Sequence, residues 1–245
     1  MTKCNSVSPR KVPTLVIAAD RRYLLDGIAT IPDDRGIFLP TTWRMRPEIC
    51  QFISESVYEG RLKSESVASD RHIIFPSSRS AGVVKKSEGL LFIPVEHEGN
   101  SQGSDEEVSA IQEIAGELRQ CDYVDEKRER RKINLDDILV VAPYNLQVRL
   151  LKRALGQKAR VGTIDKFQGQ EAVAVIISMC ASAPDASPRG LDFLLDKNRL
   201  NVAISRAKCL AIIVGHPSLG RGRCTTLRQM NLSNLFCRAV AEACG

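Results

Sequence analysis

The sequence predicts a doubly wound α/β fold, in which a parallel sheet is covered by helices on both faces. Two observations lead to this class. Four stretches are apolar throughout, as strands buried on both faces are: residues 90–95, 138–143, 173–179 and 210–215. Stretches with helical patterns lie between them, so that strands and helices alternate along the chain. The chain has 245 residues, 43% of them apolar, which is enough to bury a sizeable core.

The N-terminal third contains three further expected elements. Residues 14–19 have the composition of a strand, residues 23–31 that of a short helix, and residues 47–58 that of a longer helix. The longer helix has a proline in its first turn and an apolar stripe along one face. The polar, serine-rich residues 59–88 are expected to form a surface excursion.

The middle of the chain supplies a helix after each of the first two apolar strands. Ser104 and Glu107 form a capping box, which predicts that a helix begins there. The mixed charge of residues 122–132 favours a solvated loop. Asn145 is placed to cap a second helix that runs to Leu155.

The C-terminal part is expected to hold two more helices, over residues 198–208 and about 226–243, after a loop at 182–190. No internal repeat is present. No apolar run approaches the roughly 20 residues needed to span a bilayer. The first residues also lack the apolar core of a signal peptide. A cytoplasmic protein without membrane contact is therefore expected.

Composition restricts the function only loosely. The formal net charge of +6 permits a polyanionic partner but does not require one. There are eight cysteines, none of them in a C-x-x-C pair, and three histidines that lie far apart in the sequence: His72, His97 and His216. This pattern predicts reduced, mostly buried thiols and no metal centre.

Three stretches combine polar or aromatic side chains with neighbouring apolar elements: residues 41–47, 161–172 and 201–208. In doubly wound folds, ligands bind at the carboxyl ends of the strands, and we expect these stretches there. An arginine finger that stabilises charge on a γ-phosphate is worth roughly 10³–10⁵ in rate. Arg44 and Arg206 are the candidates, although either of them taken alone is better explained as a surface or salt-bridged arginine.

Other residues in these stretches suit a nucleotide or a nucleic-acid strand. Trp43, the single tryptophan, is able to stack on a base or to pack half-buried. Glu171, after Gly169, suits a ribose hydroxyl, and Thr163 and Tyr144 suit a strand phosphate. The alternative for each carboxylate or hydroxyl is an ordinary loop residue.

A phosphate-binding loop is missing from the sequence. The motif needs a Gly-Lys pair, and none of the 16 glycines precedes a lysine. No apolar strand ends in Asp-Glu either, so no ligand for Mg²⁺ is evident. The sequence therefore indicates one wall of a nucleotide site without the other.

Four motifs in order are more specific than their parts: W-R-M-R-P at 43–47, V-V-A-P-Y-N at 140–145, T-I-D-K-F-Q-G-Q-E at 163–171 and N-V-A-I-S-R-A-K at 201–208. Together they resemble the second RecA-like domain of superfamily-one DNA/RNA helicases of the nonsense-decay-factor type, which translocate 5′ to 3′. Residues 24–39 are similar to bacterial proteins that fuse a RecB-like nuclease domain to such a helicase. The resemblance covers residues 23–215.

The resemblance implies a role for each matching residue. Arg44 and Arg206 would reach the γ-phosphate. The nucleotide contacts would be Trp43, Gly169, Gln170 and Glu171. The single-strand contacts would be Tyr144, Asn145, Thr163 and Ser205. ATP and Mg²⁺ would bind only in a complete motor that has a first RecA-like domain. The chain departs from the family at Arg46, where the usual motif R-M-H-P has a histidine.

The expected domain organisation is an uninformative segment at 1–22, a RecA-like domain at 23–220 and a C-terminal helix, within 221–245, packed on that domain. The family's first RecA-like domain is expected before Tyr23, where only 22 residues stand. A truncated or split gene follows as an expectation. The partners would be single-stranded DNA or RNA and a first RecA-like domain, with or without a RecB-like nuclease domain, encoded separately or lost. The alternatives are a non-catalytic nucleic-acid-binding or docking module, and a gene remnant.

Overall fold

The computed structural model of this protein describes Thr30 and residues 36–78, 82–167, 169–183 and 187–244. The chain divides into two units, Met1–Phe38 and Leu39–Gly245, and the elements given below belong to the second. The strand expected at 14–19 and, apart from Thr30, the helix expected at 23–31 lie outside the described residues. Within the described part of the chain, no helix is both long and apolar enough to cross a membrane.

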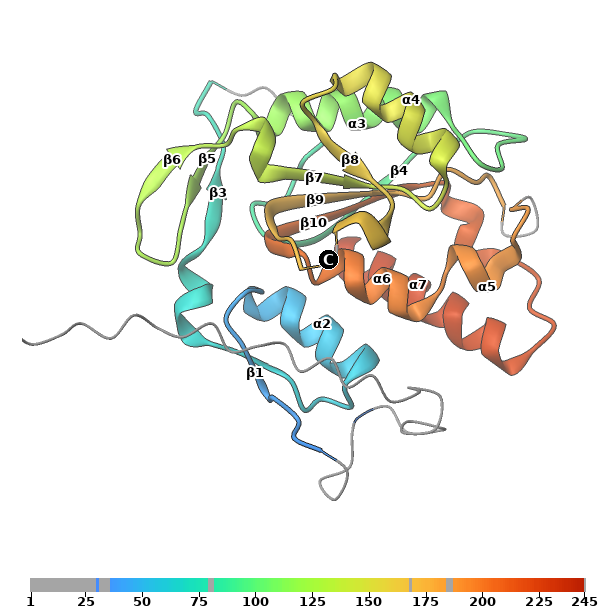
Figure 1. Cartoon of the computed structure of the whole chain (residues 1–245), viewed down its shortest axis with the longest axis horizontal. Coiled ribbons are helices and arrows are strands. Elements are labelled where there is room, and N and C mark those ends of the chain that lie inside the picture. Colours follow the sequence, from blue (N-terminus) through green and yellow to red (C-terminus); the bar gives the residue numbers. More distant parts are fainter. Residues whose placement is uncertain (1–29, 31–35, 79–81, 168, 184–186, 245) are drawn as a thin grey trace, which may run out of the picture. The chain divides into compact units, whose positions relative to one another are not determined.

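A five-stranded sheet forms the centre of the second unit, and all of its neighbouring strands run parallel. The strand order is β4-β10-β9-β7-β8 (Figure 1). The strands are β4 (Gly89–Pro94), β7 (Ile138–Val141), β8 (Arg160–Gly162), β9 (Ala172–Ser178) and β10 (Ala207–Gly215). The four apolar strands expected from the sequence are thus confirmed. The additional strand, β8, has 3 residues, too few to show an apolar pattern.

One face of the sheet packs against two helices (Figure 1). Alternate side chains of a strand point to opposite faces, and on this face Val140, Ile176 and Ile212 belong to one buried cluster. The helices that complete the cluster are α3 (Asp105–Leu118) and α4 (Asn145–Leu155). This cluster is the first of two hydrophobic cores.

The opposite face carries the second core, which contains the next residue of each strand: Val141, Ile177 and Ile213. The helices packed there are α2 (Pro47–Val57), α5 (Gly190–Leu194), α6 (Lys197–Ile204) and α7 (Leu227–Cys244). In this core the rings of Phe236 on α7 and Phe92 on β4 meet edge to face at 6.2 Å. Helices therefore cover both faces, which confirms the doubly wound α/β class.

Residues 122–132 form a hairpin and not the expected loop. Its strands β5 (Asp122–Val124) and β6 (Arg130–Lys132) pair antiparallel with each other, and β5 pairs with β3 (His72–Ile74). Charge pairing explains the difference, because Lys132 on β6 places its Nζ 2.9 Å from the Oδ1 of Asp122 on β5. Opposite charges directly across a hairpin stabilise the strands that carry them.

The segment expected to be a surface excursion, 59–88, also contains regular structure. Besides β3 it holds β2 (Lys63–Ser64), which pairs parallel with β1 (Thr41–Thr42). It also holds the short 3₁₀ helix η1 (Ser66–Asp70). The other short 3₁₀ helices lie further along the chain: η2 (Leu135–Asp137), η3 (Ile164–Phe167) and η4 (Pro217–Arg221).

Helix α6 ends four residues before its expected end at 208. Ala207 already belongs to β10 and pairs with Ala172 of β9, so the chain has to leave the helix at Ser205. The helical pattern and the strand run into each other in the sequence, which hides the boundary. As a result Arg206 lies in the turn between α6 and β10 and not within a helix.

Candidate functional site

The first group of expected site residues gathers at the amino end of the sheet. Glu171 immediately precedes β9, Arg206 immediately precedes β10, and these two strands are neighbours. The backbone N–H of Ala172 donates to the carbonyl oxygen of Arg206 at 3.1 Å, which fixes the two strand starts side by side. Arg44 joins them from the segment between β1 and α2, with its Nε 2.8 Å from Oε2 of Glu171.

Glu171 is held by two cations at once. Besides Arg44, Lys208 on β10 places its Nζ 2.7 Å from Oε1 of the carboxylate. Partial burial alone would raise the pKa of Glu171, but the hydrogen bonds from Lys208 and Arg44 outweigh it and the pKa is lowered. Glu171 is therefore a firmly ionised carboxylate in the middle of three positively charged side chains.

Arg206 is the cation of this group that has an uncommitted donor. Its Nε is buried and has no hydrogen-bond partner among the described residues. Burial and the nearby positive charge of Arg44 both lower the pKa of Arg206, and Glu171 offsets only part of that effect. A buried donor without a partner is costly, and an anion that accepts from the partly buried guanidinium relieves that cost.

A cavity of about 420 Å³ adjoins this group. Arg44, Glu171 and Lys208 line it together with Trp43, whose side chain is 64% exposed. The other lining residues are Thr41, Thr42, Arg71 and Glu126. The open indole at the edge of a charged cavity is able to stack on a planar ring.

The two remaining expected nucleotide residues shape the approach to Glu171 but do not line the cavity. Gly169 adopts a φ of 81°, which only glycine takes up readily, and turns the chain toward β9. The Oε1 of Gln170 accepts a hydrogen bond of 2.9 Å from Arg160 on β8. The amide of Gln170 is thereby committed to the protein itself.

Sequence reasoning gave no role to five residues of this cavity: Thr41, Thr42, Arg71, Glu126 and Lys208. Lys208 follows Arg206 by two positions at the start of a strand, and residues two apart in a strand share a face. The spacing between Arg206 and Lys208 could therefore have indicated that Lys208 belongs to the site. Arg71 and Glu126, paired at 3.0 Å, come from the ends of β3 and β5, and nothing in their local sequence indicates the cavity.

The second group of expected residues lies at the carboxyl end of the sheet. Tyr144 and Asn145 follow β7, Thr163 follows β8, and all three line a cavity of about 370 Å³. Asn145 is exposed, and the first turn of α4 begins there without a side-chain cap from Tyr144. Free N–H groups at the start of a helix favour a phosphate oxygen.

Tyr144 is expected to contact a nucleic-acid strand directly, but the structure buries its side chain. Its side chain is buried, its hydroxyl is hydrogen-bonded to the Oγ of Ser187, and its ring lies 5.3 Å from the ring of Phe193. Tyr144 thus supports the wall of the cavity and presents little surface to a ligand. Asn145 is also the first residue of α4 and not its cap, since Tyr144 takes the cap position.

Ser205 does not join Tyr144, Asn145 and Thr163. It lies at the opposite end of the sheet, where its carbonyl oxygen accepts a hydrogen bond of 3.5 Å from Nη1 of Arg44. Its own hydroxyl donates to the carbonyl oxygen of Val202 at 3.3 Å. The expectation that all three stretches lie at the carboxyl ends of the strands is therefore wrong for Glu171, Ser205 and Arg206.

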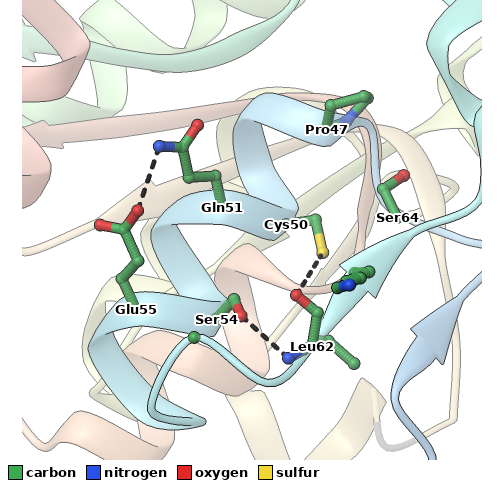
Figure 2. A pocket seen from close by; sticks show the side chains of 9 residues that line it. Pro47, Cys50, Gln51, Ser54, Glu55, Leu62 and Ser64 are labelled. Atoms are coloured by element: carbon green, nitrogen blue, oxygen red, sulfur yellow. Dashed lines mark hydrogen bonds between the residues drawn. The ribbon is translucent and has the colours of Figure 1, made fainter.

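A third cavity, of about 350 Å³, lies between α2 and the turn that precedes β2 (Figure 2). A hydrogen bond joins the two sides of this cavity, because the Oγ of Ser54 accepts the N–H of Leu62 at 2.9 Å. The Sγ of Cys50 lies 3.8 Å from the Leu62 carbonyl oxygen, and burial raises the pKa of this thiol to about 11. The thiol is therefore protonated and unreactive, and none of the expected site residues lines this cavity.

Among the described residues no group of three or more histidine, cysteine or acidic side chains is able to hold a metal ion. Two histidines that are far apart in the sequence nevertheless meet, since the rings of His97 and His216 lie 5.3 Å apart. Four cysteines are buried and form no disulfide bond, as predicted: Cys50, Cys121, Cys180 and Cys209.

The parallel sheet, with a cationic group at its amino end and a second cavity at its carboxyl end, defines a RecA-like α/β domain. Residues 22–218 match the AAA domain family, and the chain belongs to that family.

The chain is also similar to curated helicases. It is 33% identical over 182 residues to an uncharacterized ATP-dependent helicase of Caenorhabditis elegans, covering 73% of this chain and 11% of that protein. It is 33% identical over 221 residues to the DNA-binding protein SMUBP-2 of Mesocricetus auratus, covering 81% of this chain and 22% of that protein. A yeast protein, the DNA polymerase alpha-associated DNA helicase A of Saccharomyces cerevisiae, is 24% identical over 227 residues, 84% of this chain and 33% of the relative.

The chain thus spans between about a tenth and a third of the length of these three relatives. It is a helicase-family domain by its fold, its family match and its similarity to named helicases.

Proposed function

We propose that this protein is the second RecA-like domain of a superfamily-one helicase motor, which supplies Arg44 and Arg206 to a nucleotide held by a first RecA-like domain. The observation that carries this proposal is the buried, unpaired Nε of Arg206 beside Arg44 and Glu171. Two arginines gathered without enough negative charge to neutralise them favour a polyanion such as the triphosphate of ATP. Arg206 suits the γ-phosphate because a planar guanidinium matches phosphate oxygens.

The residues present fit part of a nucleotide and not its metal ion. Trp43 offers an open ring for the base, and the Glu171 carboxylate has acceptor lone pairs left for a ribose hydroxyl beside its two cations. Gly169 and Gln170 place Glu171 at the start of β9. Among the described residues that line the cavity, only Glu126 and Glu171 carry carboxylates, and both are paired with cations, so Mg²⁺ finds no vacant acidic ligand on this part of the chain. A first RecA-like domain would therefore contribute both the phosphate loop and the ligands of the metal ion.

The carboxyl-end cavity suits a single strand of DNA or RNA. Thr163 and Asn145 would contact the phosphates of the strand, and Tyr144 would form part of the cavity wall that supports these two residues. In a complete motor, closing and opening of the cleft between two RecA-like domains would move the strand past these residues. The names of two relatives, a DNA-binding protein and a DNA helicase, support a nucleic-acid partner.

A second candidate function is a non-catalytic module that binds single strands or docks onto another protein. The observation that favours it is the lack of any Gly-Lys phosphate-loop pair in the sequence. The carboxyl-end cavity would serve such a module without any nucleotide.

The deciding experiment is ATP turnover by the purified chain with single-stranded DNA, alone and with the purified product of the adjacent upstream reading frame. We expect turnover only in the mixture. Arg206→Gln should lower that turnover by roughly 10³–10⁵, because the finger stabilises charge in the transition state. The matched control is Arg119→Gln, an exposed arginine at the end of α3, which should leave turnover unchanged.

Magnesium-dependent turnover by the chain alone, abolished by Arg206→Gln, would contradict the need for a first RecA-like domain. Silence in both samples, together with measurable affinity for single strands, would favour the non-catalytic module instead.

A further inference from the structure

Phe193, which no expectation from the sequence singled out, lies under two arginines in the carboxyl-end cavity. The guanidinium carbon of Arg189 is 3.7 Å from the centre of the Phe193 ring, and that of Arg199 is 4.4 Å from it. All three residues line the same cavity as Asn145 and Thr163. An aromatic face attracts a cation electrostatically, so the ring holds both guanidinium groups at the cavity wall.

The charge of this cavity is unbalanced. Three arginines line it, since exposed Arg149 on α4 joins Arg189 and Arg199. The only carboxylate among the described lining residues is Asp165, which is 78% exposed and lies 3.8 Å from Nη2 of Arg199. An ion pair at that distance and exposure contributes little. The cavity therefore has a surplus of positive charge that solvent or an anion has to balance.

Neighbouring elements of the fold hold Phe193 and Arg199 in position. Phe193 lies on the short helix α5, and its ring packs against the buried ring of Tyr144, whose hydroxyl is bonded to Ser187. Arg199 lies in the first turn of α6, where its N–H is capped by Oδ1 of Asp196 at 2.9 Å. Tyr144 is buried because its ring packs against Phe193, and it thereby links Phe193 to the turn between β7 and α4.

We propose that Arg189 and Arg199, positioned on the ring of Phe193, bind a backbone phosphate of the single strand, next to the nucleotides that contact Asn145 and Thr163. This assignment rests on the proposed strand-binding function. A phosphate is the chemistry that fits, because two planar guanidinium forks offer several donors to its oxygens without reading a base. The contact is thus independent of base sequence. Arg189 and Arg199 are binding residues, and Phe193 is a positioning residue.

The test is the affinity of the full chain for a fluorescently labelled single-stranded homopolymer oligonucleotide, measured by anisotropy between 50 and 200 mM salt. Arg189→Gln and Arg199→Gln should each weaken binding by about threefold or more at 50 mM salt and make the salt dependence shallower, because each removes one phosphate contact. Arg119→Gln, which removes an equal charge at the opposite end of the sheet, should change neither quantity.

Phe193 is tested by two substitutions. Phe193→Tyr keeps an aromatic face under the arginines and should retain the affinity and its salt dependence. Phe193→Leu keeps apolar bulk but loses the face and should weaken binding by about threefold, with the shallower salt dependence of Arg189→Gln. Equal binding by both variants would overturn the positioning role, and melting curves that match the parent chain would exclude unfolding as the cause.

The two proposals fail in different ways. If the parent chain binds no single strand, the proposed strand-binding function is wrong and the phosphate contact falls with it. If the parent chain binds, and Thr163→Val weakens binding while Arg189→Gln and Arg199→Gln behave like Arg119→Gln, only the phosphate contact is wrong.

Discussion

At the scale of single residues, Glu171 shows how the charges at the amino end of the sheet depend on one another. Its carboxylate pairs with both Arg44 and Lys208. In the proposed nucleotide site, a ligand hydroxyl that binds Glu171 would share the carboxylate oxygens with these cations and weaken their hold on it. Binding of the ribose and the position of Arg44 would then be coupled through one side chain.

This coupling predicts a pH dependence of stability. The pKa of Glu171 is lower in the folded protein than its ordinary value of 4.5, because of the hydrogen bonds from Lys208 and Arg44. A lowered folded-state pKa adds stability above the unfolded value, and that stability is lost as the pH falls below 4.5 toward the folded value. The site is partly exposed, so we expect a contribution of no more than about 1 kcal/mol.

Urea unfolding of the parent chain and of Glu171→Gln at a series of pH values measures this contribution. The parent should be more stable by a constant amount between pH 5 and 7, and the difference should shrink as the pH falls below 4.5. Glu129→Gln is a suitable control because Glu129 is exposed in the hairpin. A difference that grows in acid would contradict the assignment.

At the scale of elements, Glu107 ties the starts of α3 and α4 to the carboxyl end of β9. Its Oε2 accepts a hydrogen bond from the hydroxyl of Ser178 at 2.6 Å, and its carboxylate accepts the N–H of Cys180. Gln147 on α4 donates to Ser178 and accepts the N–H of Ser104 at 2.9 Å. These contacts fix the helix starts that form the wall behind Asn145.

The same contacts correct the expected capping box. The hydroxyl of Ser104 does cap the helix by accepting the N–H of Glu107 at 3.1 Å. The side chain of Glu107 does not return the bond, because it is fully buried and turned toward β9, while Gln147 takes the N–H of Ser104. A capping-box pattern fixes the helix start and leaves open which partner the glutamate finds.

Glu107→Ala should lower the free energy of unfolding by about 3–5 kcal/mol, because it leaves the buried N–H of Cys180 and hydroxyl of Ser178 without their acceptor. Urea denaturation measures the change. Glu113→Ala, on an exposed position of the same helix, should change stability by less than about 0.5 kcal/mol. A loss below 1 kcal/mol at Glu107 would mean that other groups replace the carboxylate.

At the scale of the whole domain, the two groups of site residues lie at opposite ends of one parallel sheet. The seven residues of β9 span roughly 20 Å between them. Substitutions that far apart and without shared partners act independently. The nucleotide-side and strand-side groups should therefore be separable by mutation.

With the complementing first RecA-like domain present, Thr163→Val should weaken strand binding by about threefold or more and leave turnover at saturating strand unchanged. Arg44→Gln should lower turnover and leave strand affinity unchanged, since its guanidinium lies at the other end of the sheet. Anisotropy and ATP turnover measured on both variants check this. Parallel losses in both assays would show that the two ends are energetically coupled.

The sequence alone determined the layers of this protein. Strands buried on both faces must be apolar throughout, and the helices that cover them must be amphipathic. A parallel sheet covered on both faces was therefore predicted from four apolar stretches: residues 90–95, 138–143, 173–179 and 210–215. The candidate residues Arg44, Trp43, Glu171 and Thr163 were also open to prediction, because their motifs are local.

Only the tertiary structure decided how those residues are grouped. The end of the sheet at which a residue lies depends on whether it precedes or follows its strand and on which strands are neighbours, so Ser205 separated from Thr163 and joined Arg44. The partners of Glu171 and Glu107 lie far away along the chain, as does Tyr144, against which the ring of Phe193 packs, and none of them carries a local pattern. Pairing between distant side chains is a property of the packed core, and no periodicity in the sequence encodes it.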